Sequence, residues 1–425
     1  MTVGAPAARR WPAIRVRRWT RPPWALWTLV LIATKPLADV LSERTLADRL
    51  DPGVAWAATS LLLLAGWALT RRRTSIDATL LTLTWLALAA LAAFATVRIA
   101  GLPAAVEAGK VLAGLAPIVI LVGSRNPDLQ RLRWPLAAFA AGAAIHVAVA
   151  WLQAAGYVDT TYTQSSLGRT IGRPSGLFYH PVTLAYHLVF VVLVTGLLER
   201  RGLVRPGVAL PVMAVAVLSV FVSTHRMGAV AVLLALAAWA VVRLAPRRAV
   251  SRRALLAVGI AVLVALGVGV TGSGAWSEAA DRLWGGVAGV LREGDLDPTS
   301  DRFLRGRGRI WAGAADLVAT AEPVRRWAGY GVQVVDPHTD YLRLPLVHGV
   351  VGSGLILAFL ALVGVASGRR CDPTGVWYVL VAFGLLGLYA LTTKPTSYTS
   401  FMWLWSVAVW LAAATSVRRS RGAAA

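Results

Sequence analysis

Long apolar runs separated by short polar connections make up most of the chain. Each run is about 17–24 residues long, which is enough for an α-helix to cross roughly 30 Å of hydrocarbon. The runs occupy residues 22–42, 53–70, 76–96, 101–122, 134–156, 178–198, 207–223, 227–244, 254–271, 342–365, 374–392 and 400–416. This pattern predicts an all-α polytopic membrane protein with about twelve transmembrane helices.

One connection is much longer than the others and covers residues 272–341, between the ninth and tenth runs. It ends in two polar motifs, Gly329-Tyr330-Gly331 and Asp336-Pro337-His338-Thr339-Asp340-Tyr341. No hydrophilic stretch exceeds about 70 residues, so residues 1–425 are interpreted as a single integral membrane domain. Crossing a bilayer does not require such a loop, and we therefore expect any chemistry to lie in it or beside it.

The composition fits a membrane protein and excludes two kinds of site. Hydrophobic residues make up 57% of the chain and charged residues 15%, whereas a soluble domain is about one quarter charged. The single cysteine, Cys371, excludes an internal disulfide and a cysteine metal site. No small-residue cleavage site follows the basic N-terminal segment, so the first apolar run is expected to be a retained helix rather than a signal peptide.

The basic residues are concentrated in alternate connections. One set of connections, which includes both ends of the chain, holds 25 basic and four acidic residues. The opposite set holds 16 basic and 14 acidic residues. Positive charge is retained on the cytoplasmic side of a membrane. The asymmetry therefore predicts cytoplasmic termini and places loop 272–341 on the outer side. It also accounts for the net charge of +23 without a nucleic-acid partner.

Several cationic side chains belong to the predicted outer connections or to the outer parts of helices. Arg226 lies in a connection of only three residues, 224–226, and is therefore predicted at the membrane surface. The set also includes Arg169, Arg173, Arg309, Lys35 and Lys394. Arginine binds phosphate oxygens through two parallel hydrogen bonds, and a histidine such as His338 can accept a proton from a hydroxyl group. Together these residues suit cleavage of a phosphate-activated bond, with arginines stabilising the developing pyrophosphate charge.

Some of these polar residues also have ordinary structural interpretations. Arginines near helix ends often anchor a helix at the membrane interface. Glu107 and Lys110 are three positions apart and fit a pair that neutralises itself. His146 and His187 lie within apolar runs and fit packed positions. Apolar residues at helical spacing from Ile310 to Val318 predict an amphipathic helix, which either frames a lipid entrance or only covers the bundle.

Three segments resemble the bacterial O-antigen ligase and O-antigen polymerase superfamily. The first is Arg173-Pro174-Ser175-Gly176-Leu177-Phe178-Tyr179-His180-Pro181, and the second is Ser223-Thr224-His225-Arg226-Met227-Gly228-Ala229. The third runs from Arg309-Ile310-Trp311 through Gly329-Tyr330-Gly331 and His338-Thr339-Asp340-Tyr341-Leu342 to Gly349-Val350-Val351-Gly352. The twelve-helix layout is also similar, so the order of the motifs and the topology carry the resemblance together.

This resemblance implies a metal-independent, membrane-embedded glycosyltransferase that uses no cofactor. Such an enzyme moves a glycan from a polyprenyl-pyrophosphate carrier to a hydroxyl of a glycan or glycolipid acceptor, at the outer face of the bacterial cytoplasmic membrane. By position, the resemblance assigns Arg173 and Arg226 to the pyrophosphate and His338 to the acceptor. Around these three, the candidate substrate-binding residues are Arg169, Arg309, His180, Lys35, Lys394 and Tyr341.

The chain departs from the superfamily pattern at three positions. Thr339 stands where the family often has asparagine, His348 where it often has an acidic residue, and His180 where asparagine is common. These differences concern the identity of the acceptor more than the type of reaction. They also leave room for His180 or His348 to contribute to the site.

Two other functions stay open. A polymerase of the same superfamily would use a second lipid-linked repeat as its acceptor and would make a ladder of products. A twelve-helix transporter is a different class of protein, which builds its site near the bilayer midplane from broken helices and internal repeats. Here the polar residues gather at the predicted outer surface and no repeat is evident, which favours the transferase.

Overall fold

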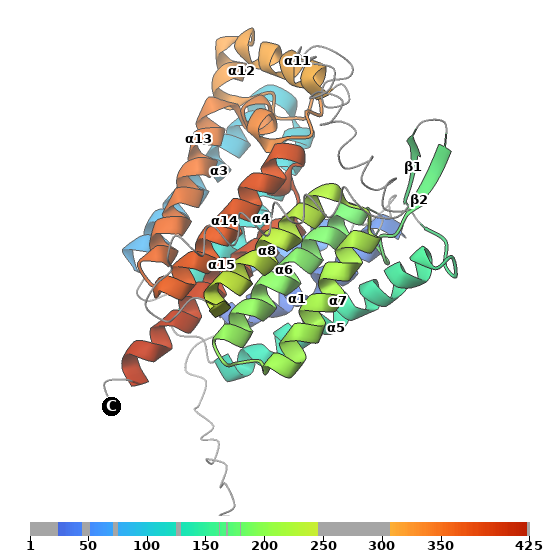
Figure 1. Ribbon diagram of the computed structural model, residues 1–425. Helices are drawn as coiled ribbons and strands as arrows, with labels where there is room; N and C mark the ends of the chain where they lie inside the picture. The colour runs from blue at the N-terminus through green and yellow to red at the C-terminus, as the bar shows by residue number, and fades with distance from the viewer. Residues whose placement is uncertain are drawn as a thin grey trace, which may run out of the picture.

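The computed structural model describes residues 24–44, 52–70, 75–124, 129–160, 162–166, 169–178, 180–244 and 307–422. Figure 1 shows long helices packed side by side, with a small β-hairpin at one edge. The first part of the chain forms α1 (Trp24–Arg44), α2 (Pro52–Thr70), α3 (Ile76–Ala95), the π-helix η1 (Thr96–Ala100), α4 (Leu102–Gly123), α5 (Leu129–Ala154), β1 (Tyr162–Ser166), β2 (Arg169–Arg173), α6 (Pro181–Arg200), α7 (Pro206–Val222) and α8 (Arg226–Leu244). The last part forms α11 (Arg307–Ala319), α12 (Pro323–Ala328), α13 (Asp340–Gly368), α14 (Pro373–Thr392), the 3-10 helix η3 (Pro395–Ser397) and α15 (Thr399–Gly422).

The predicted helical architecture is confirmed in the residues that the structure describes. Eleven of the twelve apolar runs coincide with helices, and the remaining run, 254–271, lies outside the described residues. Within the described ranges, seven helices are long and apolar enough to cross a membrane: Ile76–Ala100, Leu102–Gly123, Pro135–Ala154, Pro181–Arg200, Met227–Leu244, Asp340–Gly368 and Pro373–Thr392. Shorter apolar stretches belong to α1, α2 and α7. These helices indicate a lipid bilayer as the surroundings of the bundle.

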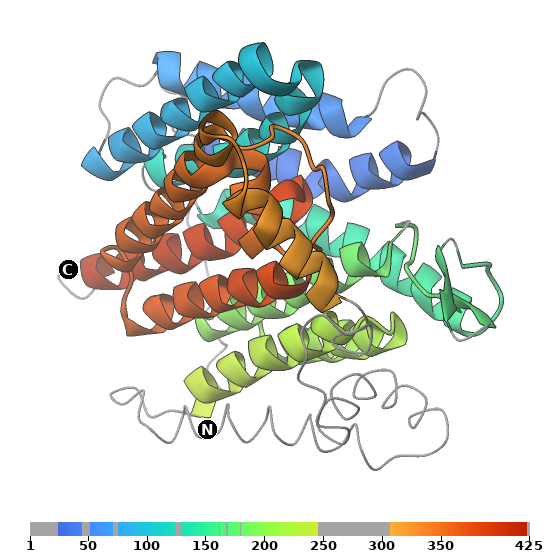
Figure 2. The same cartoon turned by 90° about the horizontal axis from the view of Figure 1, so that it is seen from above.

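Apolar side chains lie both inside the bundle and on its outer surface. The core is built around α15, whose apolar part is almost entirely buried because α4, α6 and α14 pack against it (Figures 1 and 2). Trp403 and Trp405 of α15 are fully buried. At the periphery, Leu62 of α2 and Leu83 of α3 are exposed. Helices that are hydrophobic all round suit a bundle whose outer face contacts hydrocarbon.

Helix α13 is interrupted at Gly349, whose φ of 65° and ψ of −177° are not helical. The carbonyl of Val347, next to the break, accepts a hydrogen bond from the N–H of Gly331 over 2.9 Å. Gly329 has a φ of 80°, and a Cβ at this position would lie only 2.2 Å from the Val347 carbonyl oxygen. Only glycine allows two backbones to approach this closely with such dihedral angles. The contact holds the end of the long loop against α13.

We call one end of the bundle the site end. It holds the first residues of α6, α8 and α13 and the last residues of α14. Helices α11 and α12 cross over the start of α13 there, and the β-hairpin projects at the same end (Figure 1). Strands β1 and β2 pair antiparallel, with Tyr162 opposite Arg173 and Ser166 opposite Arg169. The hairpin therefore ends with Arg173 just before α6.

The opposite end of the bundle is joined by a bidentate ion pair. Arg201, which follows α6, donates to both carboxylate oxygens of Asp372 over 2.6 and 2.7 Å, and to the Ser416 hydroxyl over 2.9 Å. Burial favours the neutral carboxyl group, but the hydrogen bonds from Arg201 and from the Gly375 N–H outweigh it and lower the pKa of Asp372 to about 2. These contacts tie the ends of α6, α14 and α15 together.

Candidate functional site

Arg173 is held against the turn between α7 and α8. This turn is as short as the sequence predicts, since α7 ends at Val222 and α8 begins at Arg226. The Arg173 guanidinium donates from Nε to the Thr224 side-chain oxygen over 3.0 Å and from Nη2 to the Thr224 carbonyl over 2.6 Å. Thr224 has a φ of 51°, which is uncommon for a residue other than glycine. The guanidinium thus supports a turn whose backbone conformation is unfavourable by itself.

Arg226 is the first residue of α8 and follows this turn directly. Its backbone therefore lies close to the segment that binds Arg173, while its side chain is outside the part of the structure that is described. The side chain of Arg169, at the start of β2, lies outside it as well. Two of the predicted phosphate ligands, Arg173 and Arg226, thus come from elements in direct contact.

His180 caps the start of α6 and is held as a neutral imidazole. Its Nδ1 accepts a hydrogen bond from the Val182 N–H over 3.1 Å. Burial, and then the positive charge of Arg173, lower the pKa of His180 to about 4. Because Nδ1 is the acceptor, the proton of the neutral ring is on Nε2. His180 is therefore suited to donate a hydrogen bond near Arg173 and is poorly suited to act as a base.

His338 extends from a loop that is fixed on both sides. Its backbone has a φ of 50°, and its N–H donates to Asp336 Oδ1 over 3.0 Å. Trp311 of α11 donates from Nε1 to the carbonyl just before His338 over 2.8 Å, and the Thr339 hydroxyl donates to the Ala390 carbonyl over 2.7 Å. The imidazole is 52% exposed, with Nδ1 3.5 Å from Asp336 Oδ2. An exposed imidazole is therefore carried by a well-anchored backbone.

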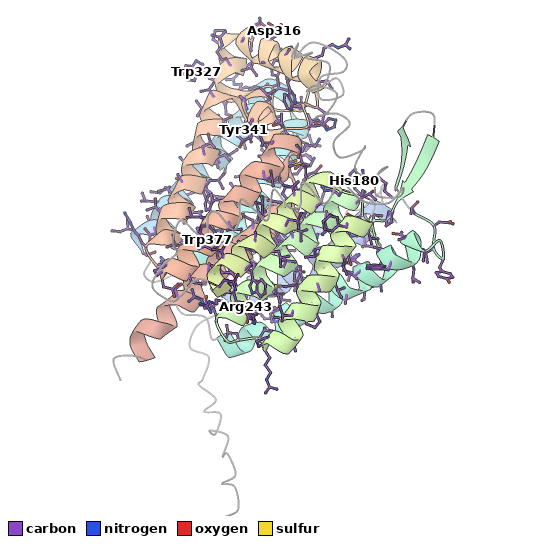
Figure 3. All side chains as sticks on the ribbon, in the orientation of Figure 1. His180, Arg243, Asp316, Trp327, Tyr341 and Trp377 are labelled. Carbon is purple, nitrogen blue, oxygen red and sulfur yellow. The ribbon has the colours of Figure 1, made fainter. Side chains whose placement is uncertain are left out.

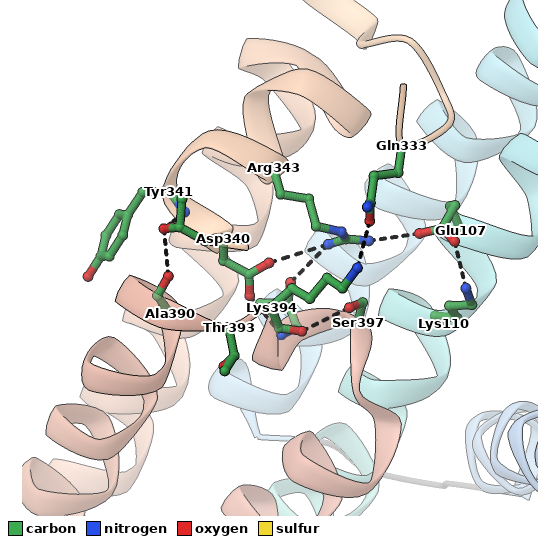
Figure 4. Close-up of polar contacts among 12 residues, drawn as sticks. Glu107, Lys110, Gln333, Asp340, Tyr341, Arg343, Ala390, Thr393, Lys394 and Ser397 are labelled. Carbon is green, nitrogen blue, oxygen red and sulfur yellow. Dashed lines mark hydrogen bonds and ion pairs between the residues drawn. The ribbon is translucent and has the colours of Figure 1, made fainter. Parts of the chain in front are cut away.

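Lys394 contacts the same carboxylate as His338. It follows α14, and its Nζ donates to Asp336 Oδ2 over 2.8 Å and to Gln333 Oε1 over 3.0 Å. Burial raises the pKa of Asp336, but the hydrogen bonds from Lys394 and from the His338 N–H outweigh it and lower the pKa below its usual value. Lys394, Asp336 and His338 form a continuous group, and Figure 4 shows Lys394 reaching toward Gln333.

A buried arginine that the sequence prediction missed lies beside this group. Arg343, in the first turn of α13, is fully buried. Its guanidinium pairs with Glu107 of α4 over 2.9 Å and with Asp340 over 3.4 Å (Figure 4). Asp340 also accepts a hydrogen bond from the Thr396 N–H over 2.8 Å. The charge of Arg343 is thus balanced, and the network joins α4, α13 and η3.

The prediction that Glu107 and Lys110 neutralise each other is confirmed, with 2.6 Å between Nζ and Oε1. It was incomplete, because Glu107 also accepts from Arg343. The sequence did contain a signal for Arg343, since a charged residue just inside an apolar run marks a buried partner or a functional position. No local sequence pattern indicated that Glu107 would be the partner of Arg343, because the two residues are 236 positions apart.

The three remaining substrate-binding candidates belong to α1, α13 and α11. Lys35 of α1 is buried inside the bundle, with Nζ 5.9 Å from the ring centroid of Trp403. Tyr341, at the start of α13, is 57% exposed and its hydroxyl lies 3.5 Å from the Gly387 carbonyl. Arg309 is exposed on α11. Figure 3 shows Tyr341 and His180 toward the same end of the bundle.

The helix predicted from Ile310 is present as α11, which ends at Ala319. After a turn, the short helix α12 begins at Pro323. Ala314 is buried and Trp311 binds the loop before His338, but Ile310 is exposed. The predicted apolar face is therefore only partly covered, and α11 supports the loop with its inner side.

The end of α14 connects the arginine group with the histidine group. The ring of His225, which precedes Arg226, stacks on Tyr389 of α14 with 6.4 Å between centroids and 10° between planes. The next residue, Ala390, accepts a hydrogen bond from the threonine that follows His338. Two consecutive residues of α14 thus contact the immediate neighbours of two predicted catalytic residues.

The remaining histidines with predicted roles occupy packed or apolar surroundings. His146 stacks on Phe178 with 3.9 Å between ring centroids, and His187 lies 4.8 Å from the same ring, so the packed interpretation of both is confirmed. His348 lines a cavity of about 30 Å³ between α3, α4 and α13, whose other lining residues are apolar or glycine. His348 thus faces an apolar space, whereas His338 belongs to a charged group.

No protein-family model matches the chain, and no curated protein matches it in sequence. Within the described ranges, no group of three or more His, Cys, Asp or Glu side chains is arranged to hold a metal ion. The fold and the site define the class as a helical membrane protein that carries the Arg173 group and the His338 group at its site end. Any more specific function has to be argued from the chemistry of those groups.

Proposed function

We propose that this protein is a membrane-embedded glycosyltransferase that moves a glycan from a polyprenyl-pyrophosphate carrier to an acceptor hydroxyl. The observation that carries the proposal is the presence of two complementary groups at the same end of an apolar bundle, linked through Tyr389 and Ala390 of α14. One group contains Arg173, bound to the turn that carries Arg226. The other contains the exposed His338 beside Asp336. A lipid-linked substrate needs both a phosphate-binding group and a base at the membrane surface, and this end of the bundle offers both.

The proposed reaction forms one bond and breaks one bond. The acceptor hydroxyl gives its proton to His338 as its oxygen forms a bond to the anomeric carbon of the donor glycan. The bond between that carbon and the pyrophosphate oxygen breaks, and polyprenyl pyrophosphate leaves with the electron pair. Arg173 and Arg226 stabilise the negative charge that develops on the leaving group. The guanidinium groups take the part that a metal ion has in many other glycan transfers.

The other candidate residues have supporting roles in this proposal. His180, a hydrogen-bond donor near Arg173, extends the phosphate-binding group, and Arg169 lies at the other end of β2 from Arg173. Tyr341 and Arg309 lie near the start of α13 and on α11, where an acceptor glycan would approach His338. Lys35 is retained as a candidate for the donor, although its buried position requires that the substrate enter the bundle.

The site end faces the outer side of the bacterial cytoplasmic membrane in this proposal, with twelve helices and both termini cytoplasmic. The excess of basic residues in the connections at the opposite end supports this orientation. A membrane-impermeant maleimide tests it in a Cys371→Ser background. An Asp316→Cys variant, on α11, should react from outside intact cells, and a Leu203→Cys variant, after α6, should react only after lysis. The reverse pattern would reject the orientation.

The transferase proposal is tested with purified protein in liposomes. The protein is given a purified polyprenyl-pyrophosphate-linked glycan and a glycolipid acceptor, with EDTA present. The expected result is glycan on the acceptor and release of polyprenyl pyrophosphate. A ladder of products made from the donor alone would assign the polymerase activity instead, and absence of any transfer would reject both.

One observation favours a transporter as the second candidate. Helix α13 is broken at Gly349, and transporters form binding sites at breaks in apolar helices. At this break, however, the Val347 carbonyl is already bound to the N–H of Gly331, which leaves less of the backbone for a substrate. Uptake of a glycan or lipid-linked glycan into liposomes without chemical change would favour the transporter over the transferase.

A further inference from the structure

Asp336 contacts both His338 and Lys394, and the same carboxylate group thus joins the exposed imidazole to the lysine that follows α14. We propose that Asp336, fixed by Lys394, is a positioning residue that holds His338 with its proton on Nδ1 and its lone pair on Nε2. The catalytic consequence rests on the proposed function, whereas the arrangement of the side chains does not. Lys394 is thereby reassigned from substrate binding to the support of Asp336.

Both oxygens of Asp336 face hydrogen-bond donors. Oδ1 accepts from the backbone N–H of His338 over 3.0 Å, and Oδ2 accepts from Lys394 Nζ over 2.8 Å. Oδ2 also lies 3.5 Å from His338 Nδ1, within ion-pair range. Only a carboxylate offers acceptors at both positions, because an asparagine would place its NH2 group against one of these donors. The donors around position 336 therefore favour an ionised aspartate.

Lys394 is held in place by contacts besides its ion pair with Asp336. Its Nζ also donates to Gln333, and the η3 turn that follows it is tied to α13 through the hydrogen bond from the Thr396 N–H to Asp340. The Lys394 side chain is only 21% exposed, and Asp336 cancels its charge locally. A substrate phosphate would therefore have to displace an existing ion pair. The geometry suits a lysine that keeps Asp336 ionised and fixed.

The carboxylate next to Nδ1 determines which nitrogen of His338 is available. It favours a proton on Nδ1, because the other tautomer would set the Nδ1 lone pair against a negatively charged oxygen. The lone pair of the neutral ring is then on Nε2, where it can take a proton from an acceptor hydroxyl. The resulting imidazolium faces Asp336, which stabilises the charge. The same carboxylate also holds the left-handed backbone of His338.

The test compares Asp336→Asn with Asp316→Asn in the full-length protein in liposomes. Asp316 lies exposed on α11 in the same loop, so its variant removes one carboxylate without touching His338. Asp336→Asn should lower kcat for glycan transfer about 100-fold with little change in the KM for the lipid-linked donor. Asp316→Asn should transfer at the normal rate. Normal kcat in Asp336→Asn, or an equal loss in both variants, would overturn the positioning role.

Lys394 provides a second comparison that does not depend on the folding of Asp336→Asn. Lys394→Met, which removes the charge but keeps much of the length, should lower kcat about 10-fold or more, and Lys394→Arg should retain most of the activity because it keeps the ion pair. A large rise in donor KM in Lys394→Met, with kcat unchanged, would return Lys394 to substrate binding and overturn its reassignment.

A measurement independent of activity separates this inference from the proposed function. NMR of protein labelled at both histidine ring nitrogens reports the tautomer, and the signal missing from His338→Asn identifies His338 among the six histidines. We expect the Nδ1-protonated form in the wild type and its loss in Asp336→Asn. That result without any glycan transfer would reject the transferase but keep the positioning role. If the tautomer of His338 were unchanged in Asp336→Asn, the positioning role would be overturned, even if the wild-type protein transfers glycan.

Discussion

Arg343 of α13 and Glu107 of α4 form an ion pair across 236 positions of sequence, with 2.9 Å between Nη2 and Oε2. Arg343 is fully buried, and its second partner, Asp340, is buried as well. Removing one member of such a group leaves an uncompensated charge away from water. The pair fastens α4 to the first turn of α13, and the loop that carries His338 leads directly into that turn.

We expect Arg343→Met to lower the free energy of unfolding by about 3–5 kcal/mol, because Glu107 and Asp340 would lose their shared buried partner. Lys110→Met is the matched control. Lys110 pairs with the same Glu107 but is 45% exposed, so its loss should cost less than about 1 kcal/mol. Unfolding of the purified protein by a denaturing detergent measures both. Equal losses of unfolding free energy in the two variants would show that the burial of Arg343 does not determine its contribution to stability.

Arg173→Ala and Arg226→Ala should each lower the rate of glycan transfer by about 100- to 1000-fold, because each removes a donor that stabilises the leaving pyrophosphate. Both variants should still insert into the membrane and accumulate. Arg325→Ala serves as control, since that guanidinium lies over the Tyr330 ring at 5.3 Å, away from the Arg173 group. Normal rates in both Arg173→Ala and Arg226→Ala would reject the assignment of the donor site.

His338→Ala should lower kcat by about 100- to 10,000-fold without preventing donor binding, because it removes the base and leaves the arginines in place. His338→Asn should show the same loss. Asparagine tolerates the left-handed backbone at this position better than alanine, so this variant separates the chemistry from backbone strain. Transfer rates and binding of the lipid-linked donor are the measurements. If His338→Asn turned over normally, His338 would be structural, and His180 and His348 would be tested next.

Gly349→Ala should destabilise the protein by at least about 1–3 kcal/mol, because alanine is strained at a φ of 65°. Its Cβ would also lie 2.2 Å from the Trp327 carbonyl oxygen and would push the long loop away from α13. Gly354→Ala, on the same helix with open space around it, should be neutral or stabilising by up to about 1 kcal/mol. Thermal unfolding in detergent compares the two, and a neutral Gly349→Ala would contradict the close backbone contact.

The ion pair between Arg201 and Asp372 predicts a dependence of stability on pH. The folded-state pKa of Asp372 is about 2, below its usual 3.8, so its stabilisation is fully present above about pH 4 and is lost as the pH falls toward 2. Asp372→Asn should therefore cost about 1.5–3 kcal/mol at neutral pH and little near the acid end of this window. Unfolding measured across the window checks this. A constant difference between the two proteins at all pH values would contradict it.

The helices could be predicted from the sequence because their signals are local. The predicted run 178–198 became α6 at Pro181–Arg200, shifted because His180 caps the helix and Pro181 fits its first turn. The run 342–365 became α13 at Asp340–Gly368, since Thr339 caps the helix and extends it beyond the apolar residues. The break at Gly349 was not predicted, because it depends on a loop backbone that packs against the helix.

Sequence alone determined the apolar helices, the short turn before Arg226, the pairing of Glu107 with Lys110 and the candidate residues themselves. These rest on spacing along the chain, which hydrophobic length and helix periodicity translate directly into structure. Tertiary structure alone decided which charges meet. Lys394 reaches Asp336 across 58 positions and Arg343 reaches Glu107 across 236, and both depend on how helices pack rather than on any local pattern. The sequence indicated that Lys394 was a cation available to a substrate, whereas the packing of the helices makes it a partner of Asp336. The packing also shows that Arg343 anchors the first turn of α13, which follows the loop that carries His338.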